Sequence, residues 1–169
     1  YPRIVGETGG KDFILAHPSA DPDAVSTAIV RGSFEYQGQK CSAASRAYVP
    51  ASLWPMVKER MLAMIAEIRM GDVRDFRNFM GAVIDKRAYD RITGYLAQAR
   101  KDPGVTILAG GGAKRDTGFF IEPTLIQAKE PDYLSMREEI FGPVVTAYVY
   151  PDAKWAQTLD LVDETSPYA

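Results

Sequence analysis

The sequence predicts a layered α/β domain, with a largely parallel central sheet flanked by helices. Short apolar runs typical of buried strands alternate with longer stretches in which apolar residues recur at helical spacing. Strands that are connected through helices run parallel in one sheet, and the helices pack on its faces. Hydrophobic residues make up 46% of the 169 residues, which is enough to bury the core of one ordinary domain.

The first expected strand–helix unit starts with the apolar run 12–16, which reads as a buried strand closed by a proline turn. Asp21 directly precedes a proline, and this pairing favours Asp21 as the amino-terminal cap of a helix. Apolar residues at helical spacing extend this helix over 22–36, and Gly38 is expected to end it.

A second strand is expected over 46–50, followed by a long amphipathic helix with Ser52 as its cap. The glycine–aspartate pair at 71–72 is expected to end this helix. The apolar residues expected on one face of the helix are Leu53, Val57, Met61, Met64, Ile65 and Ile68.

The second half of the chain continues the alternation of strands and helices. A third helix is expected over 86–101, followed by a strand at 105–109 and a glycine turn at 110–112. Later elements are expected as strand pieces at 119–121 and 124–126, a strand at 144–150 and a helix at 154–163.

Composition excludes several classes of protein. The formal net charge of −2 gives no basic footprint for nucleic acid, and no apolar run approaches the roughly 20 residues that span a bilayer. A single cysteine cannot form an internal disulfide, which favours a reducing compartment. The chain has no initiating methionine, so we expect residues 1–169 to be one domain cut from a longer chain.

Cys41 lies in a polar segment rich in small residues, 34–46, between an expected helix and an expected strand. A buried structural cysteine normally has aliphatic neighbours, whereas Lys40 and nearby backbone amides favour the thiolate form of Cys41. This segment alone leaves two interpretations open, a reactive nucleophile and an incidental half-buried thiol.

Glu7 lies in the segment Gly-Glu-Thr-Gly-Gly-Lys just before the first strand, where paired glycines allow close backbone approach. A carboxylate in such a position is suited to act as a general base. The alternative, which is favoured when Glu7 is considered by itself, is a solvated turn residue paired with Lys11.

Other polar features indicate structural roles. The glycine runs at 9–10 and 110–112 lack the spacing of phosphate-binding motifs and are interpreted as turns. His17 is the only histidine, and its place between a strand and a proline favours a structural hydrogen bond. One cysteine and one histidine cannot supply the ligands of a zinc site. The acidic and aromatic segment 138–143 is interpretable as a helix end followed by a turn.

Three ordered motifs together resemble the aldehyde dehydrogenase superfamily. They are Glu-x-Gly-Gly-Lys, Phe-x-x-x-Gly-Gln-x-Cys-x-Ala-x-x-Arg and Glu-x-Phe-Gly-Pro. The matching residues are Glu7, Gly9, Gly10 and Lys11; Phe34, Gly38, Gln39, Cys41, Ala43 and Arg46; and Glu139, Phe141, Gly142 and Pro143. The resemblance extends through essentially the whole chain, including 118–124.

Departures from the commoner superfamily motifs resemble one branch. Gly6 and Thr8 replace leucines beside Glu7, and Gly-Glu-Thr-Gly-Gly-Lys-Asp-Phe, Phe-Glu-Tyr-Gln-Gly-Gln-Lys-Cys-Ser-Ala and Tyr-Val-Tyr-Pro-Asp are similar to the Δ1-pyrroline-5-carboxylate dehydrogenase branch. The resemblance implies NAD-dependent oxidation of L-glutamate 5-semialdehyde to glutamate in proline catabolism.

The resemblance also implies roles for individual residues. Cys41 would be the nucleophile that forms a thiohemiacetal and then a thioester, and Glu7 would activate the water that hydrolyses the thioester. Glu139 and Phe141 would contact the nicotinamide riboside of NAD. Lys40 and Ser42, which flank the nucleophile, would bind the substrate.

By the same resemblance, the dinucleotide-binding domain lies outside this chain, the whole protein forms a homo-oligomer, and the chain alone is inactive. The expected compartment is the cytoplasm in a bacterium and the mitochondrial matrix in a eukaryote.

Alternatives within the enzyme class are oxidation of another aldehyde and CoA acylation; Glu7 weighs against acylation because a water-activating base serves hydrolysis. A catalytically silent structural protein is the alternative outside that class, and an intact Cys41 and Glu7 argue against it.

Overall fold

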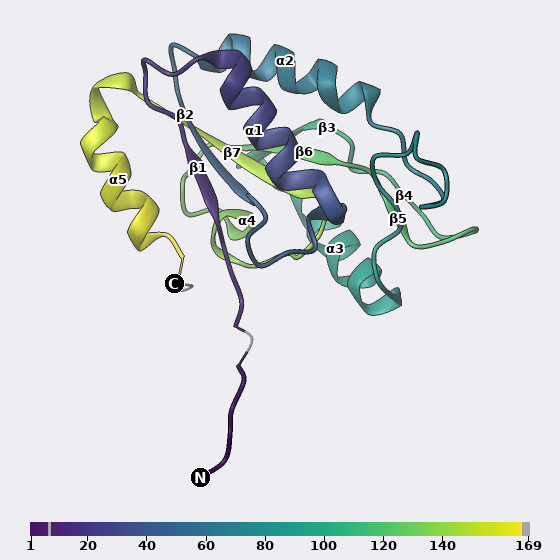
Figure 1. The fold of residues 1–169 in the computed structure, drawn as a ribbon. Coiled ribbons are helices and arrows are strands. Elements are labelled where there is room, and N and C mark those ends of the chain that lie inside the picture. Colours follow the sequence, from purple (N-terminus) through teal and green to yellow (C-terminus); the bar gives the residue numbers. More distant parts are fainter. Residues whose placement is uncertain (7, 167–169) are drawn as a thin grey trace.

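The computed structural model describes residues 1–6 and 8–166, and it confirms the expected α/β architecture (Figure 1). A five-stranded sheet has the order β1-β2-β7-β6-β3; the pairs β1–β2, β2–β7 and β6–β7 are parallel, whereas β3 and β6 are antiparallel. The strands are β1 (Phe13–Leu15), β2 (Arg46–Pro50), β3 (Val105–Ala109), β6 (Thr124–Ala128) and β7 (Val144–Tyr150).

Alternate residues of the strands face two separate helical layers. Ala47 and Val145 share a core with α1 (Pro22–Phe34) and α2 (Trp54–Glu67). On the opposite face, residues of β6 and β7 pack in one cluster with α3, and residues of β2 and β7 pack in another with α4 and α5. These three helices are α3 (Lys86–Ala99), α4 (Leu134–Arg137) and α5 (Trp155–Glu164).

The start of α1 is as expected, but its end differs. The Asp21 carboxylate accepts hydrogen bonds from the backbone N–H groups of Asp23 (2.7 Å) and Ala24 (3.0 Å), so it caps the helix. The α-helix ends at Phe34, and a short 3₁₀ segment, η1 (Glu35–Gly38), follows. The expected helix over 22–36 is therefore two residues too long, because the backbone turns left-handed at Tyr36.

The expected cap and end of α2 are wrong. Helix α2 begins at Trp54 and ends at Glu67, well before the pair 71–72. The Ser52 side chain does not cap it; instead, the Ser52 backbone N–H donates to the Asp152 carboxylate at 3.0 Å. The expected apolar face is confirmed: Leu53, Val57, Met61 and Ile65 are buried, and Met64 and Ile68 pack partly buried against them.

Two short features complete the fold. One is α4, a single turn of four residues that ends just before Glu138, where the sequence indicated a helix end. The other, which was not expected, is a hairpin of β4 (Ala113–Lys114) and β5 (Phe120–Ile121) outside the main sheet. The strand piece at 119–121 thus belongs to this hairpin.

The glycine run at 110–112 is not the expected turn, because the chain continues beside the same partner segment: Ala109 pairs with Leu125, Ala113 pairs with Ile121, and the Glu122 N–H donates to the Gly112 carbonyl at 2.9 Å. Gly110 and Gly111 have positive φ within this continuous run. The pair at 9–10 is likewise not a turn. None of the helices in the described ranges is long and apolar enough to cross a membrane.

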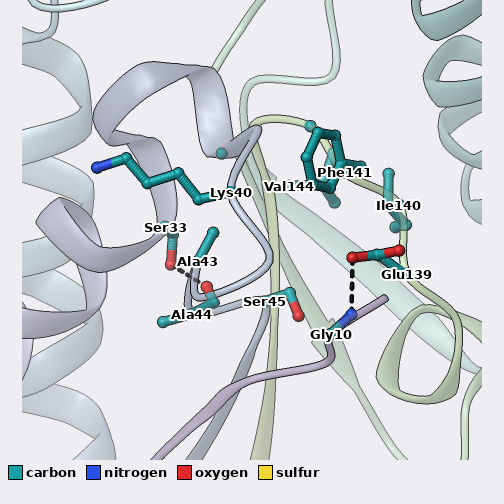
Figure 2. Close-up of a pocket in the computed structure, with 12 residues that line it drawn as sticks. Gly10, Ser33, Lys40, Ala43, Ala44, Ser45, Glu139, Ile140, Phe141 and Val144 are labelled. Carbon is teal, nitrogen blue, oxygen red and sulfur yellow. Dashed lines mark hydrogen bonds between the residues drawn. The ribbon is translucent and has the colours of Figure 1, made fainter. Parts of the chain in front are cut away.

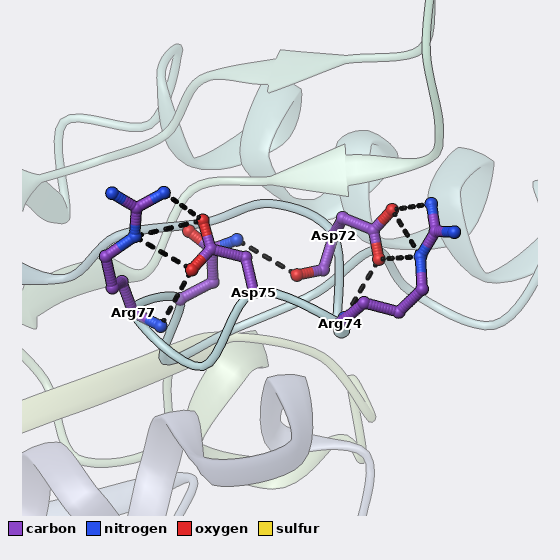
Figure 3. A network of polar contacts seen from close by, with 5 residues as sticks. Asp72, Arg74, Asp75 and Arg77 are labelled. Carbon is purple, nitrogen blue, oxygen red and sulfur yellow. Dashed lines mark hydrogen bonds and ion pairs between the residues drawn. The ribbon is translucent and has the colours of Figure 1, made fainter.

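The loop between α2 and α3 is held by two local ion pairs (Figure 3). Arg74 donates from Nε and Nη2 to the Asp72 carboxylate, and Arg77 does the same to Asp75. These hydrogen bonds lower the pKa of both carboxyl groups. The pairs are solvent-exposed, so we expect them to shape the loop more than they stabilise the fold.

Candidate active site

Three segments that are distant in the sequence meet around one open cleft of about 890 Å³. The first lies before β1 and contributes residues between 6 and 12, the second is the turn 39–42 between α1 and β2, and the third is 139–141 before β7. Each carries one of the three motifs found in the sequence. The topology thus brings Cys41, Glu139 and Phe141 to the lining of the same cleft.

Cys41 is a free, exposed cysteine in this cleft. The turn that carries it is closed by a hydrogen bond from the Ala43 N–H to the Lys40 carbonyl at 3.1 Å. It is anchored to α1 by a bond from the Ala44 N–H to the Gly32 carbonyl at 3.0 Å. The thiol is therefore exposed, not half-buried, and its role as a nucleophile stays a prediction. The thiol is accessible and stands on a well-defined turn.

Two glycines allow the motif segments to approach each other. A Cβ atom at Gly10 would collide with the Cys41 carbonyl oxygen, and one at Gly38 would collide with the Gly142 carbonyl oxygen. Gly38 also has a φ of +64°, which a side chain would strain. Both positions therefore need glycine, because the backbones that carry the three motifs are in direct contact there.

Glu139 links the first and third segments by a hydrogen bond (Figure 2). The Gly10 backbone N–H donates to Glu139 Oε1 at 2.9 Å, and the carboxylate is half-buried. Phe141, two residues later, has a φ of 53°, which is uncommon for a residue with a side chain. Ile140 between them is buried, so the chain anchors in the core and leaves Glu139 and Phe141 lining the cleft.

Lys40 and Ser42 are exposed and line the cleft on either side of Cys41. The Lys40 ammonium lies 3.9 Å from a Glu35 carboxylate oxygen, and in Figure 2 its side chain extends away from Glu139. Glu7 lies outside the described residues, although its neighbours Gly6 and Thr8 line the cleft.

Lys11 has a very different environment from the solvated one that pairing with Glu7 would imply. It is only 3% exposed, and its ammonium has no hydrogen-bond partner among the described residues. Burial, reinforced by the nearby Arg46 charge, lowers the pKa of Lys11 to about 7, while Glu139 and Glu138 act in the opposite direction. The sequence alone did not indicate this burial.

His17 makes the kind of local contact expected of it. Its Nδ1 accepts from the Ser19 backbone N–H at 3.1 Å, and its ring packs edge-on against Trp155. It does not line the cleft that holds Cys41. Within 1–6 and 8–166, no three histidine, cysteine, aspartate or glutamate residues are grouped so that they could hold a metal ion.

Comparison with known proteins decides the family. Residues 1–166 match the model of the aldehyde dehydrogenase family. The chain belongs to this family. It is 53% identical over 169 residues to the mitochondrial Δ1-pyrroline-5-carboxylate dehydrogenase of Dictyostelium discoideum, with 100% of this chain and 30% of that protein covered. It is 50% identical to the human mitochondrial enzyme of the same name, with coverage of 99% and 30%.

Solved structures agree with this placement of the aldehyde dehydrogenase chain. The Δ-pyrroline-5-carboxylate dehydrogenase of Mycobacterium tuberculosis bound with NAD superposes with a TM-score of 0.92 at 45% identity, covering 100% of this chain and 30% of the other. The NAD-bound enzyme from Thermus gives a TM-score of 0.87 at 30% identity, with coverage of 96% and 30%. The chain thus spans about 30% of the length of these relatives.

The buried Lys11 leads to a pH-dependent prediction for stability. Its pKa is lower in the folded state than in the unfolded chain, so the folded state takes up the proton less readily. The free energy of unfolding should therefore fall as pH decreases from about 10.5 to about 7, and level off below that. Replacing Lys11 with Met should remove this decrease in the free energy of unfolding. The decrease amounts to several kcal/mol, because each tenfold change in proton affinity is worth about 1.4 kcal/mol.

The measurement is urea unfolding of the polypeptide that contains this chain, between pH 6 and pH 10. Lys101→Met, at an exposed position, is the matched control and should keep the wild-type pH dependence. The same pH dependence in Lys11→Met and wild type would show that Lys11 is not buried as an unpaired amine.

Proposed function

We propose that this chain is the cysteine-bearing catalytic domain of a longer, NAD-dependent aldehyde dehydrogenase that oxidises L-glutamate 5-semialdehyde to glutamate. The observation that carries the proposal is the meeting of Cys41, Glu139 and Phe141 around one cleft, with the segment that contains Glu7 at its wall. The relatives named as Δ1-pyrroline-5-carboxylate dehydrogenases, at about half identity, support the choice of substrate.

The residues at the cleft fit NAD. The half-buried Glu139 carboxylate is an acceptor suited to ribose hydroxyl groups, and the Phe141 side chain offers an apolar surface for a planar ring. Gly9 and Gly10 also line the cleft and bring no side chain into it. When bound, NAD supplies the acceptor for the hydride that leaves the substrate carbon.

In the proposed reaction, the Cys41 thiolate forms a bond to the aldehyde carbon, and the carbonyl oxygen becomes an oxyanion. The Cys41 backbone N–H donates to no described residue, which leaves it available to stabilise this oxyanion. Loss of the hydride from the same carbon converts the thiohemiacetal into a thioester on Cys41. The exposed position of the thiol on a fixed turn suits both steps.

Glu7 is proposed to act in the second half of the reaction. Its carboxylate would accept a proton from a water molecule that attacks the thioester carbon, and the carbon–sulfur bond then breaks to release glutamate and the Cys41 thiolate. A general base for water is required when hydrolysis ends the cycle, but not when CoA accepts the acyl group. The presence of Glu7 therefore favours hydrolysis over acylation.

Lys40 and Ser42 flank the nucleophile and are proposed to line the pocket for the substrate carboxylate. Because the Lys40 ammonium lies toward Glu35, this role requires it to exchange one carboxylate partner for another.

We further propose that the dinucleotide-binding domain is another part of the polypeptide and that the whole protein forms a homo-oligomer. The eukaryotic relatives named as mitochondrial support a matrix location if the source is a eukaryote, and a bacterial source would place the protein in the cytoplasm.

A substrate panel on the full polypeptide tests the proposal. With NAD, we expect kcat/KM for pyrroline-5-carboxylate, in equilibrium with glutamate semialdehyde, to exceed that for simple aliphatic aldehydes by about tenfold or more, since only the former offers a carboxylate. NADH appearance is followed by absorbance.

Cys41→Ala should abolish turnover while NAD binding persists, because it removes the nucleophile and little volume. Turnover within tenfold of wild type in Cys41→Ala would contradict the assignment.

Replacing Glu7 with Gln separates the two halves of the reaction. Cys41 should still react, so a burst of NADH near one equivalent per site should precede a slow steady state. Loss of a general base typically slows its step about 10²- to 10⁴-fold, which makes thioester hydrolysis limiting. Intact-mass spectrometry of quenched enzyme should then show an acyl group on Cys41. Loss of both burst and steady state would instead place Glu7 in an earlier step.

A further inference from the structure

The backbone just before the nucleophile is strained. Tyr36, Gln37 and Gly38 have consecutive φ values of 54°, 58° and 64°, all in the left-handed region. Residues with side chains avoid this region at a cost of about 1–2 kcal/mol each, so two in a row persist only where surrounding contacts impose them. This strained turn lies three to five residues before Cys41. Contacts from other parts of the chain must therefore hold it in this conformation.

The restraint comes from two glutamine side chains. The Gln37 amide forms two hydrogen bonds with the segment 81–82: the Gly81 backbone N–H donates to Gln37 Oε1 at 3.0 Å, and Gln37 Nε2 donates to the Ala82 carbonyl at 3.3 Å. Gln39 Oε1 accepts from the Ile84 backbone N–H at 2.9 Å. Both glutamine side chains therefore bind the same short segment, 81–84, which leads directly into α3.

Helix α3 in turn supports the segment that carries Glu139 and Phe141. Arg91 donates from Nη2 to the Ile140 carbonyl at 3.2 Å. Ile92 packs so closely against Gly142 that a side chain at Gly142 would collide with it. Since Gly142 also contacts Gly38, the turn before Cys41, the segment 81–84, α3 and the segment 139–142 form a closed ring of contacts.

We propose that Gln37 is a positioning residue, whose side-chain amide ties the turn before Cys41 to the segment 81–82 that leads into α3, and so sets where Cys41 stands relative to Glu139. The proposal rests on the proposed function for its catalytic readout. Gln37 does not line the cleft, so it has no direct contact with a substrate there. Its amide is suited to the task because it donates and accepts at once, whereas the strained turn has no other side chain bonded to 81–82.

The chemistry of the amide suggests two informative substitutions. Gln37→Met keeps the length of the side chain but removes both hydrogen bonds. Gln37→Glu keeps an acceptor for the Gly81 N–H but turns a carboxylate oxygen toward the Ala82 carbonyl oxygen, and only a protonated carboxyl group can donate there. The defect in Gln37→Glu should therefore diminish as pH falls, whereas the defect in Gln37→Met should not.

The experiment uses the full polypeptide and compares each variant with Gln98→Glu, at an exposed position of α3, as the matched control. We expect Gln37→Met to lower kcat by about tenfold to a hundredfold with KM for the aldehyde changed less than about threefold, because displacing a nucleophile slows reaction more than binding. Relative to the control, kcat of Gln37→Glu should recover as pH is lowered. Thermal melting should show that the variants fold.

A second measurement does not depend on aldehyde oxidation. Alkylation of Cys41 by iodoacetamide, without cofactor or substrate, should change at least about threefold in Gln37→Met and stay unchanged in Gln98→Glu. If wild type oxidises no aldehyde, the proposed function fails, and the alkylation comparison alone decides the role of Gln37. Should Gln37→Met not fold, Gln37→Asn, which is one methylene shorter, takes its place in both assays. Values of kcat and alkylation rate equal to the control would overturn the proposal.

Discussion

The hydrogen bond from the Gly10 N–H to Glu139 joins residues that are 129 positions apart, and the geometry of the cleft depends on it. Gly10 also lies against the Cys41 carbonyl, and a side chain at position 10 would not fit there. One residue without a side chain therefore holds the three motif segments at contact distance. The parallel order β1-β2-β7 provides the frame, since each segment leads into one of these three neighbouring strands.

Local patterning was sufficient to predict most of the fold. The strands at 46–50, 105–109 and 144–150 have the predicted bounds, because each is a short apolar run between clear turn signals. The cap of α2 could not be predicted in this way. Ser52 is a favourable capping residue, but its backbone N–H is bound by Asp152, 100 residues further along, so a tertiary contact determines the local structure.

The candidate site was predictable to the extent that motifs encode it. The motifs identified Cys41, Glu139 and Phe141 as candidates, and the structure brings all three to one cleft. Spacing in the sequence did not reveal the burial of Lys11 or the two hydrogen bonds of Gln37, because both depend on elements that fold against them from elsewhere. Lysine and glutamine are usually solvated, so nothing local distinguishes these two from the exposed residues of the same types.

The backbone of Gly10 and Lys11 makes two contacts that hold the site together. The Lys11 carbonyl accepts from Arg46 Nε at 2.8 Å, and the Gly10 N–H donates to the Glu139 carboxylate. Residues 10 and 11 thus connect β2 with the segment before β7. The unfavourable burial of an amine is tolerated because the surrounding backbone contacts fix the chain in place, and it leaves a titrating group beside Glu139.

The central claim is that the Glu139 carboxylate belongs to the same site as Cys41 and contacts the cofactor there. The most direct measurement is NAD binding to the full polypeptide by calorimetry, comparing Glu139→Gln with Glu138→Gln as the control at the neighbouring, more exposed carboxylate. The account predicts about tenfold weaker binding in Glu139→Gln, because a charge-assisted acceptor is lost, and binding within about twofold of wild type in Glu138→Gln. Equal effects of the two substitutions, or none, would contradict it.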